Sequence, residues 1–243
     1  MLGPILFSLA ALTACGSLPE TSGSTAAHNL AAYEHSIVDA AVATPAKARN
    51  LVPLPPTDKV RVLSWVSTLK ELCAGGQTQC EYTVGKYGMF VTLAGEVQRK
   101  CRTWGLTGAA LRLRLEQLHG LPPDQPIQYL KARFVVLEAP TAQLLRPCLG
   151  LDEADPGHPR CGPDIKQSDR LWPLAAVGDQ MARSYVAGSP NTTGYPFTRL
   201  GYTYDWNEQS PDHYGASEFV LAPGTVTQVL EQMPTDAYCA PAN

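Results

Sequence analysis

Six cysteines spread between residues 73 and 239 constrain the fold of this 243-residue chain more than any other feature. The seventh cysteine, Cys15, belongs to the N-terminal segment considered below, and the even number that remains is typical of proteins that fold in an oxidising compartment and form disulfides. Two pairs lie close together in sequence, whereas the other two cysteines are far apart. Six cysteines can pair in many different ways. Among these we predict the bonds Cys73–Cys80, Cys148–Cys161 and Cys101–Cys239.

A metal site is the alternative use of these cysteines. Zinc sites usually place two thiolates only about two to four residues apart, and none of the six cysteines has such a neighbour. His158, Asp152, Glu153 and Asp155 lie near Cys161. Their loop lacks the regularly spaced oxygen ligands and the turn glycine of a calcium loop. We therefore expect disulfides and no metal site.

The N-terminal segment indicates where the protein resides. Residues 2–14, LGPILFSLAALTA, carry no charged side chain and are almost entirely apolar. A membrane-spanning helix needs about 20 such residues, whereas the core of a secretory signal needs about 7–15. Leu12, Thr13, Ala14 and Cys15 match the lipobox residue by residue, so the segment resembles a bacterial lipoprotein signal. The resemblance covers about the first 16 residues and implies cleavage before Cys15 and acylation of its thiol, with chains such as palmitate.

The segment departs from that family in one respect, because no Lys or Arg precedes the apolar run. A plain secretory signal with a coincidental cysteine, or an uncleaved N-terminal anchor, are therefore the alternatives. Gly16 stands where an inner-membrane retention signal would have Asp. For a bacterium with two membranes, the resemblance implies an anchor in the outer membrane, facing the periplasm, rather than in the inner membrane.

The remaining chain divides into a tether and one folded body. After the signal peptide at 1–14, residues 15–58 contain the lipidated cysteine, a small and polar spacer at 16–27, helix-compatible sequence at 28–45 and a proline-rich linker. We expect a single domain over residues 59–243. The net charge of the full chain is −3, and because nucleic-acid-binding proteins are normally basic, we expect no nucleic-acid partner.

Strand-like and helix-like segments are mixed within this domain. Apolar and β-branched runs predict strands at 60–66, 81–97 and 133–139, and further strand-like runs follow residue 199. Leucines at helical spacing predict a helix over about 108–119, and a similar pattern predicts another over about 173–186. The order lacks strict βαβ alternation, so we predict an α+β fold with a mainly antiparallel sheet, two or three helices and disulfide staples.

Aromatic residues concentrate in residues 194–219. Aromatic rings with polar atoms suit the binding of sugars, peptides or nucleotide rings. Packing between strands is the alternative explanation, and it is favoured for residues 202 and 204 because they alternate as strand residues do. The candidate binding residues in this segment are Tyr195, Tyr204, Trp206 and Tyr214.

Glu218 is the main candidate for chemistry. Residues 217–225, SEFVLAPGT, resemble the acidic strand of bacterial ADP-ribosyltransferase-type domains, where a glutamate engages NAD. The family's paired Glu-x-Glu is missing, because position 216 is Ala. The residues considered as helpers of Glu218 are Ser217, Arg199 and His213, and those considered for the phosphates of NAD are Arg61, Arg112 and Arg133.

The sequence therefore leaves two alternative hypotheses for the function. The first is a membrane-anchored extracytoplasmic lipoprotein with a binding or envelope-structural role, no cofactor, and an envelope protein or small ligand as its partner. The second is an exported enzyme that uses Glu218, most specifically in NAD-dependent ADP-ribosyl transfer or NAD glycohydrolysis. The enzyme hypothesis predicts that Glu218 lines a concave pocket with an arginine and several rings, whereas the other predicts an open face.

Overall fold

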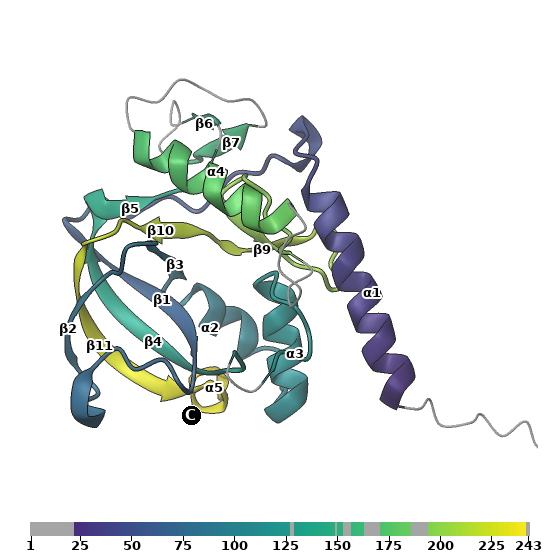
Figure 1. The fold of residues 1–243 in the computed structure, drawn as a ribbon, viewed down its shortest axis with the longest axis horizontal. Coiled ribbons are helices and arrows are strands. Elements are labelled where there is room, and N and C mark those ends of the chain that lie inside the picture. The colour runs from purple at the N-terminus through teal and green to yellow at the C-terminus, as the bar shows by residue number, and fades with distance from the viewer. Residues whose placement is uncertain are drawn as a thin grey trace, which may run out of the picture.

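The computed structural model describes residues 22–126, 129–148, 150–152, 157–162, 171–185 and 194–241. The predicted signal peptide, Cys15, Glu153 and Asp155 lie outside the described residues. A curved seven-stranded antiparallel sheet forms the centre of the fold, with the strand order β2-β11-β4-β1-β3-β10-β5 (Figure 1). Its strands are β1 (Lys59–Ser67), β2 (Cys80–Thr83), β3 (Met89–Leu93), β4 (Lys131–Pro140), β5 (Leu144–Leu145), β10 (Phe219–Leu221) and β11 (Val226–Pro234).

Two small antiparallel sheets and several helices surround the large sheet. The small sheets pair β6 (Gly150–Asp152) with β7 (Arg160–Gly162), and β8 (Tyr202–Tyr204) with β9 (Tyr214–Ser217). The helices are α1 (Ser22–Ala40), α2 (Glu96–Cys101), α3 (Gly108–Leu118), α4 (Leu171–Tyr185) and α5 (Thr235–Cys239), with 3-10 turns at Pro45–Lys47, Ala74–Gly76 and Thr141–Gln143. The predicted disulfide-stapled α+β fold with a mainly antiparallel sheet is confirmed. Sequence periodicity did not indicate α2 and α5, because each is shorter than two helical turns.

Both faces of the large sheet are buried. The central strands therefore have apolar residues at successive positions and not only at alternate ones. Alternate side chains of a strand point to opposite faces. On one face, Val62, Leu137 and Phe219 join a core that is closed by residues of the connecting loops. On the other face, Leu63 and Phe134 join a core formed with α2, α3 and α5.

The three disulfides are those predicted from the sequence. Cys73 bonds to Cys80, Cys148 to Cys161, and Cys101 to Cys239. The first two close short loops, whereas the third joins α2 to α5 across 138 residues. This long-range bond therefore fixes the C-terminal helix to the layer that covers the sheet.

The N-terminal residues are arranged differently from the expected spacer and linker. The helix α1 begins at Ser22, inside the segment that composition suggested would be a flexible spacer. Tyr33 is fully buried, and its hydroxyl donates a hydrogen bond to the Gly194 carbonyl at 2.7 Å. Leu51, from the expected linker, belongs to a core with the Cys148–Cys161 disulfide. The packed body thus includes residues well before 59. Among the described helices, none has the length and apolarity needed to cross a bilayer.

Removing the long-range disulfide should destabilise the protein more than removing a local one. The chain-entropy model gives about 5 kcal/mol for the loop closed by Cys101–Cys239 and about 2.5 kcal/mol for the loop closed by Cys73–Cys80. We expect the double variant Cys101→Ser/Cys239→Ser to lose about 2.5 kcal/mol more unfolding free energy than Cys73→Ser/Cys80→Ser. Urea denaturation of both variants measures the difference. Equal losses would show that the Cys101–Cys239 bond does not restrain the unfolded chain as proposed.

Candidate functional site

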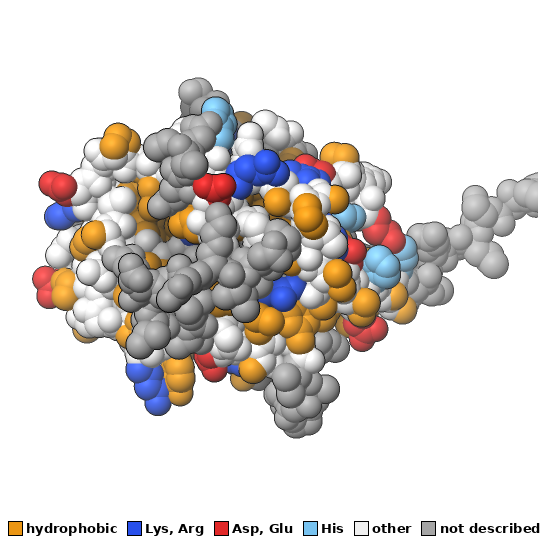
Figure 2. All heavy atoms as spheres, turned by 90° about the horizontal axis from the view of Figure 1, so that it is seen from above, with side chains coloured by type: hydrophobic (Ala, Val, Ile, Leu, Met, Phe, Trp, Pro, Cys, Tyr) orange, Lys and Arg blue, Asp and Glu red, His pale blue; other side chains and the backbone are white. Residues whose placement is uncertain are grey.

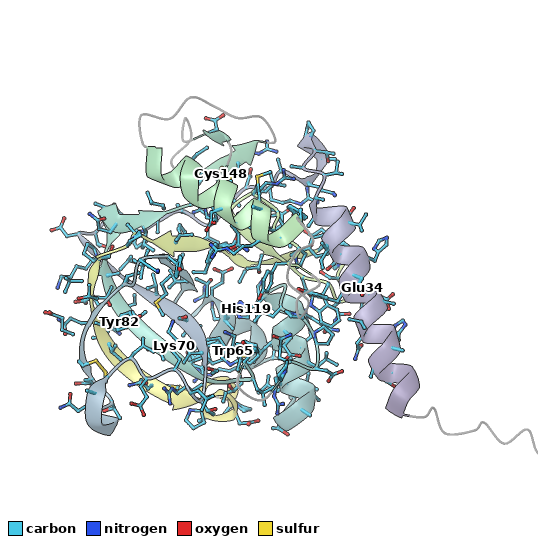
Figure 3. All side chains as sticks on the ribbon, in the orientation of Figure 1. Glu34, Trp65, Lys70, Tyr82, His119 and Cys148 are labelled. Atoms are coloured by element: carbon cyan, nitrogen blue, oxygen red, sulfur yellow. A yellow bond between two sulfur atoms is a disulfide. The ribbon has the colours of Figure 1, made fainter. Side chains whose placement is uncertain are left out.

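A cavity of about 470 Å³ lies between β1, β3, residues 217–218 just before β10, the loop after α3, helix α4 and residues 195–197. This volume is within the range of small-molecule binding sites. Figure 3 shows three of its lining residues, Trp65, Lys70 and His119, together in the middle of the molecule beside β1. The cavity is therefore enclosed by elements that are far apart in the sequence.

The cavity opens where the large sheet divides. β1 pairs with β3 at only two positions, Val62↔Leu93 and Leu63↔Thr92. β1 then continues along β4, whereas β3 continues along β10 through the pair Val91↔Phe219. Residues 64–66 and 89–92 line the cavity on its two sides. The separation of two neighbouring strands thus creates the space.

Glu218 points into this space because of its position between β9 and β10. Its neighbour Phe219 enters the core on one face of the sheet, so the alternation of a strand directs Glu218 to the other face. The Glu218 N–H donates to the Gly201 carbonyl at 3.0 Å, which fixes the backbone. Its Oε2 atom is buried and has no hydrogen-bond partner among the described residues. Burial raises the pKa of Glu218 to about 8, so the carboxyl is mostly protonated at neutral pH.

His119 is a second buried titratable group in the cavity wall. It follows the end of α3, and its ring centroid lies 6.0 Å from that of Trp65. Burial, together with the charges of Lys100 and Lys131, lowers the pKa of His119 to about 3, so the ring is neutral at pH 7. Its Nε2 atom is buried without a partner in the described part of the chain.

The charged groups of the cavity are mostly basic. Lys70, Lys131 and Arg183 line it, and Glu218 is the one carboxylate among the described lining residues. Arg183 forms an ion pair with Asp179 on α4. Within the described ranges neither lysine has a carboxylate partner. Burial lowers the pKa of both lysines, and the charge of Lys70 lowers that of Lys131 further. These two neighbouring lysines therefore supply positive charge that the protein does not neutralise.

Of the catalytic candidates, the structure brings Glu218 and Ser217 to the cavity but not Arg199 or His213. The Arg199 guanidinium is buried and donates to the Ala41 carbonyl at 2.6 Å, just after α1. The His213 ring stacks on Tyr204 with centroids 4.8 Å apart, and its Nδ1 lies 2.8 Å from the Asp205 carbonyl oxygen. Both residues hold the segment around β8 and β9 in place.

Of the candidate binding residues, Tyr195 lines the cavity, whereas the other three pack within the fold. Tyr204 and Trp206 form a small core with Tyr33 of α1. The Tyr214 ring lies 4.7 Å from that of Tyr202. Most of the aromatic concentration is therefore explained by packing.

The arginine of the cavity is Arg183, and none of the three considered for NAD lines it. Arg133, for example, donates to the Lys70 carbonyl. Sequence reasoning also missed Trp65, Lys70, His119 and Lys131, because no motif links them. No local signal in the sequence identifies these residues, since it is the strand pairing that brings them together.

On the face shown in Figure 2, the described Lys and Arg side chains form small separate groups, some of them next to Asp or Glu side chains. In the described ranges, no three His, Cys, Asp or Glu residues are grouped so as to hold a metal ion. No protein-family model, no curated protein and no solved structure matches the chain.

The raised pKa of Glu218 predicts a specific pH dependence of stability. Between its ordinary pKa of 4.5 and about 8, the unfolded chain has released this proton while the folded protein keeps it. The contribution of the Glu218 carboxyl to the free energy of unfolding is therefore fully present below pH 4.5. It is lost as the pH rises to about 8. We expect Glu218→Gln, which cannot ionise, to become more stable relative to the parent protein between pH 5 and 8.

Thermal unfolding midpoints across this pH range provide the measurement. The matched control is Glu81→Gln, since Glu81 is an exposed strand residue on β2. A constant difference between Glu218→Gln and the parent protein would mean that Glu218 is ionised in the folded state throughout the range.

Proposed function

We propose that this protein is a lipid-anchored protein of the cell envelope that binds a small organic anion with an apolar part in the Glu218 cavity. The observation that carries the proposal is the joint presence of two lysines without acidic partners and a buried carboxyl oxygen without a hydrogen-bond partner, within the described part of one cavity. Buried polar atoms usually have partners, so those left without one in a cavity suggest a ligand.

The lining residues of the cavity have complementary roles in this proposal. The ammonium groups of Lys70 and Lys131 attract a carboxylate or a similar anion. Protonated Glu218 donates a hydrogen bond to an acceptor of the ligand. Aromatic side chains, among them Trp65 and Phe197, cover the apolar part. The neutral His119 adds a polar atom to the wall without adding charge.

The location of the protein forms a separate part of the proposal. The likeness of residues 1–16 to a lipoprotein signal supports attachment to a membrane through lipid on Cys15, in the outer membrane and facing the periplasm. The three disulfides support an oxidising compartment, because cytosolic proteins rarely contain such bonds. Two or more acyl chains on one cysteine suffice for stable anchoring.

Replacing Cys15 should release the protein from the membrane. We expect the full chain to fractionate with membranes when made in a bacterium that processes lipoproteins, and Cys15→Ser to lose this association because its hydroxyl cannot form the thioether. Mass spectrometry of the mature N-terminus, with Cys73→Ser/Cys80→Ser as a control for loss of any cysteine, gives the result. An unmodified terminus remote from Cys15 would contradict the proposed anchor.

Replacing either cavity lysine should weaken anion binding. We expect Lys131→Met and Lys70→Met each to raise the dissociation constant of a bound carboxylate roughly tenfold, since each removes one charge-assisted contact. Calorimetric titration with hexanoate and phenylacetate, and with the corresponding uncharged amides, measures this effect. Lys59→Met is the matched control, because Lys59 is on β1 but pairs with Glu138 outside the cavity. If the parent protein binds these carboxylates no better than the amides, anion binding is excluded.

An enzyme that uses Glu218 as a general acid is the second candidate function. The observation in its favour is the pKa of about 8, which keeps a proton available near neutral pH. Glu218 also lies in a concave cavity with an arginine and several rings, the arrangement that the enzyme hypothesis predicts. Its NAD-dependent form is tested by NAD turnover: hydrolysis by the parent protein that Glu218→Gln abolishes would favour it over simple binding.

A further inference from the structure

The alternation of hydrogen bonds along β1 shows which main-chain groups face β3. The Thr141 N–H donates to the Asp58 carbonyl, so even-numbered residues of β1 hydrogen-bond to β4. The Ala94 N–H donates to the Arg61 carbonyl, so odd-numbered residues hydrogen-bond towards β3. By this alternation, the N–H and C=O of Trp65 point to the side where β3 has separated from β1.

The facing edge of β3 follows the same rule. Its even-numbered residues face β1, since Ala94 does, and its odd-numbered residues pair with β10 at Val91↔Phe219 and Met89↔Leu221. Trp65 and Phe90 would form the next hydrogen-bonded pair after Leu63↔Thr92, but the register ends there. Both residues line the cavity. The gap between the two strands, which we call the slit, thus has a strand edge on each side.

From these two edges we infer that the slit receives an extended peptide of about four residues, which hydrogen-bonds through its main chain to Trp65 on one side and to Phe90 on the other. A peptide strand presents N–H and C=O groups on both of its edges at the strand spacing, as few other ligands do. Its length corresponds to residues 64–67 of β1, the part of that strand beyond the last pair with β3.

The two lysines define the direction of this peptide. Lys131 pairs with Ser67 at the end of β1, and Lys70 follows three residues later, so both lie at one end of the slit. Glu218 precedes Phe219, the partner of Val91, and so lies near the closed end at Leu63↔Thr92. A C-terminal carboxylate at the lysines makes the peptide run parallel to β1 and antiparallel to β3. This inference rests on the proposed anion binding and specifies the class of anion.

The test compares three forms of one acetylated tetrapeptide of alternating alanine and leucine. The first has a free C-terminal carboxylate, the second a C-terminal amide, and the third a free carboxylate with N-methyl groups on its two central amides. Calorimetric titration of the parent protein should give binding of the first form, with binding of the other two at least tenfold weaker. In hydrogen exchange, the first form should slow the amides of Trp65 and Phe90, whereas the amide of Lys59 serves as a control outside the slit.

The outcomes separate this inference from the proposed function. Equal binding of the N-methylated and unmethylated peptides would overturn the peptide inference and leave anion binding intact, because the main-chain N–H groups would then be unnecessary. Binding of hexanoate or phenylacetate without binding of any tetrapeptide would also overturn the peptide inference and leave anion binding intact. Failure of both the simple carboxylates and the peptides would overturn both. Protection of Trp65 and Phe90 by the free carboxylate form alone would establish the peptide as the ligand class.

Discussion

The separation of β3 from β1 after two paired residues is the constraint on which the site depends. A strand can pair along only two edges, and β3 uses its second edge for β10 while β1 keeps β4. The space that opens between them receives Glu218, because Glu218 directly precedes Phe219 of β10 and faces away from the core that Phe219 joins. An unbroken sheet would leave neither a cavity nor a main chain that faces it. Both faces of the sheet are thus well packed, and the cavity is confined to the place where β1 and β3 separate.

The rest of the molecule keeps the walls of this opening in place. Tyr195 and Phe197 form one wall, and the Tyr33 hydroxyl binds the chain at Gly194, directly before that wall. Arg199 ties the other end of the same stretch to the carbonyl of Ala41. On the opposite side, the Cys101–Cys239 bond fixes α2 and α5, which cover the sheet beneath Trp65. The Trp65 Nε1–H also donates to the Thr235 hydroxyl of α5 at 3.0 Å. A residue that does not line the cavity, such as Arg199, therefore contributes to it by holding the wall residues in position.

The sequence predicts those features that depend on neighbours in the chain. The strands at 60–66 and 133–139 and the helix near 108–119 follow from local apolar patterns, and two disulfides follow from short spacings. Glu218 was singled out for its local context and does line the cavity. Lys70, His119 and Lys131 were not, because each is unremarkable within its own segment and gains its environment only from strand pairing. For the same reason the expected roles of Arg199 and His213 beside Glu218 are wrong: although they are near Glu218 in sequence, Arg199 bonds to the Ala41 carbonyl after α1 and His213 stacks on Tyr204.

The charges of the cavity also set the pH range in which the proposed anion would bind. At neutral pH, Glu218 holds its proton because burial opposes ionisation, so the cavity contains the positive charge of Lys70 and Lys131 without a compensating carboxylate. As the pH rises past about 8, Glu218 ionises and adds a negative charge to the same space. A carboxylate bound at the lysines would oppose that ionisation, since a negative charge in the same cavity raises the pKa of a carboxyl group. By linkage, the proposed anion and the proton of Glu218 would each favour the binding of the other. Binding of the proposed anion above pH 8 would therefore be coupled to uptake of a proton, a coupling that a cavity with lysines alone would not have.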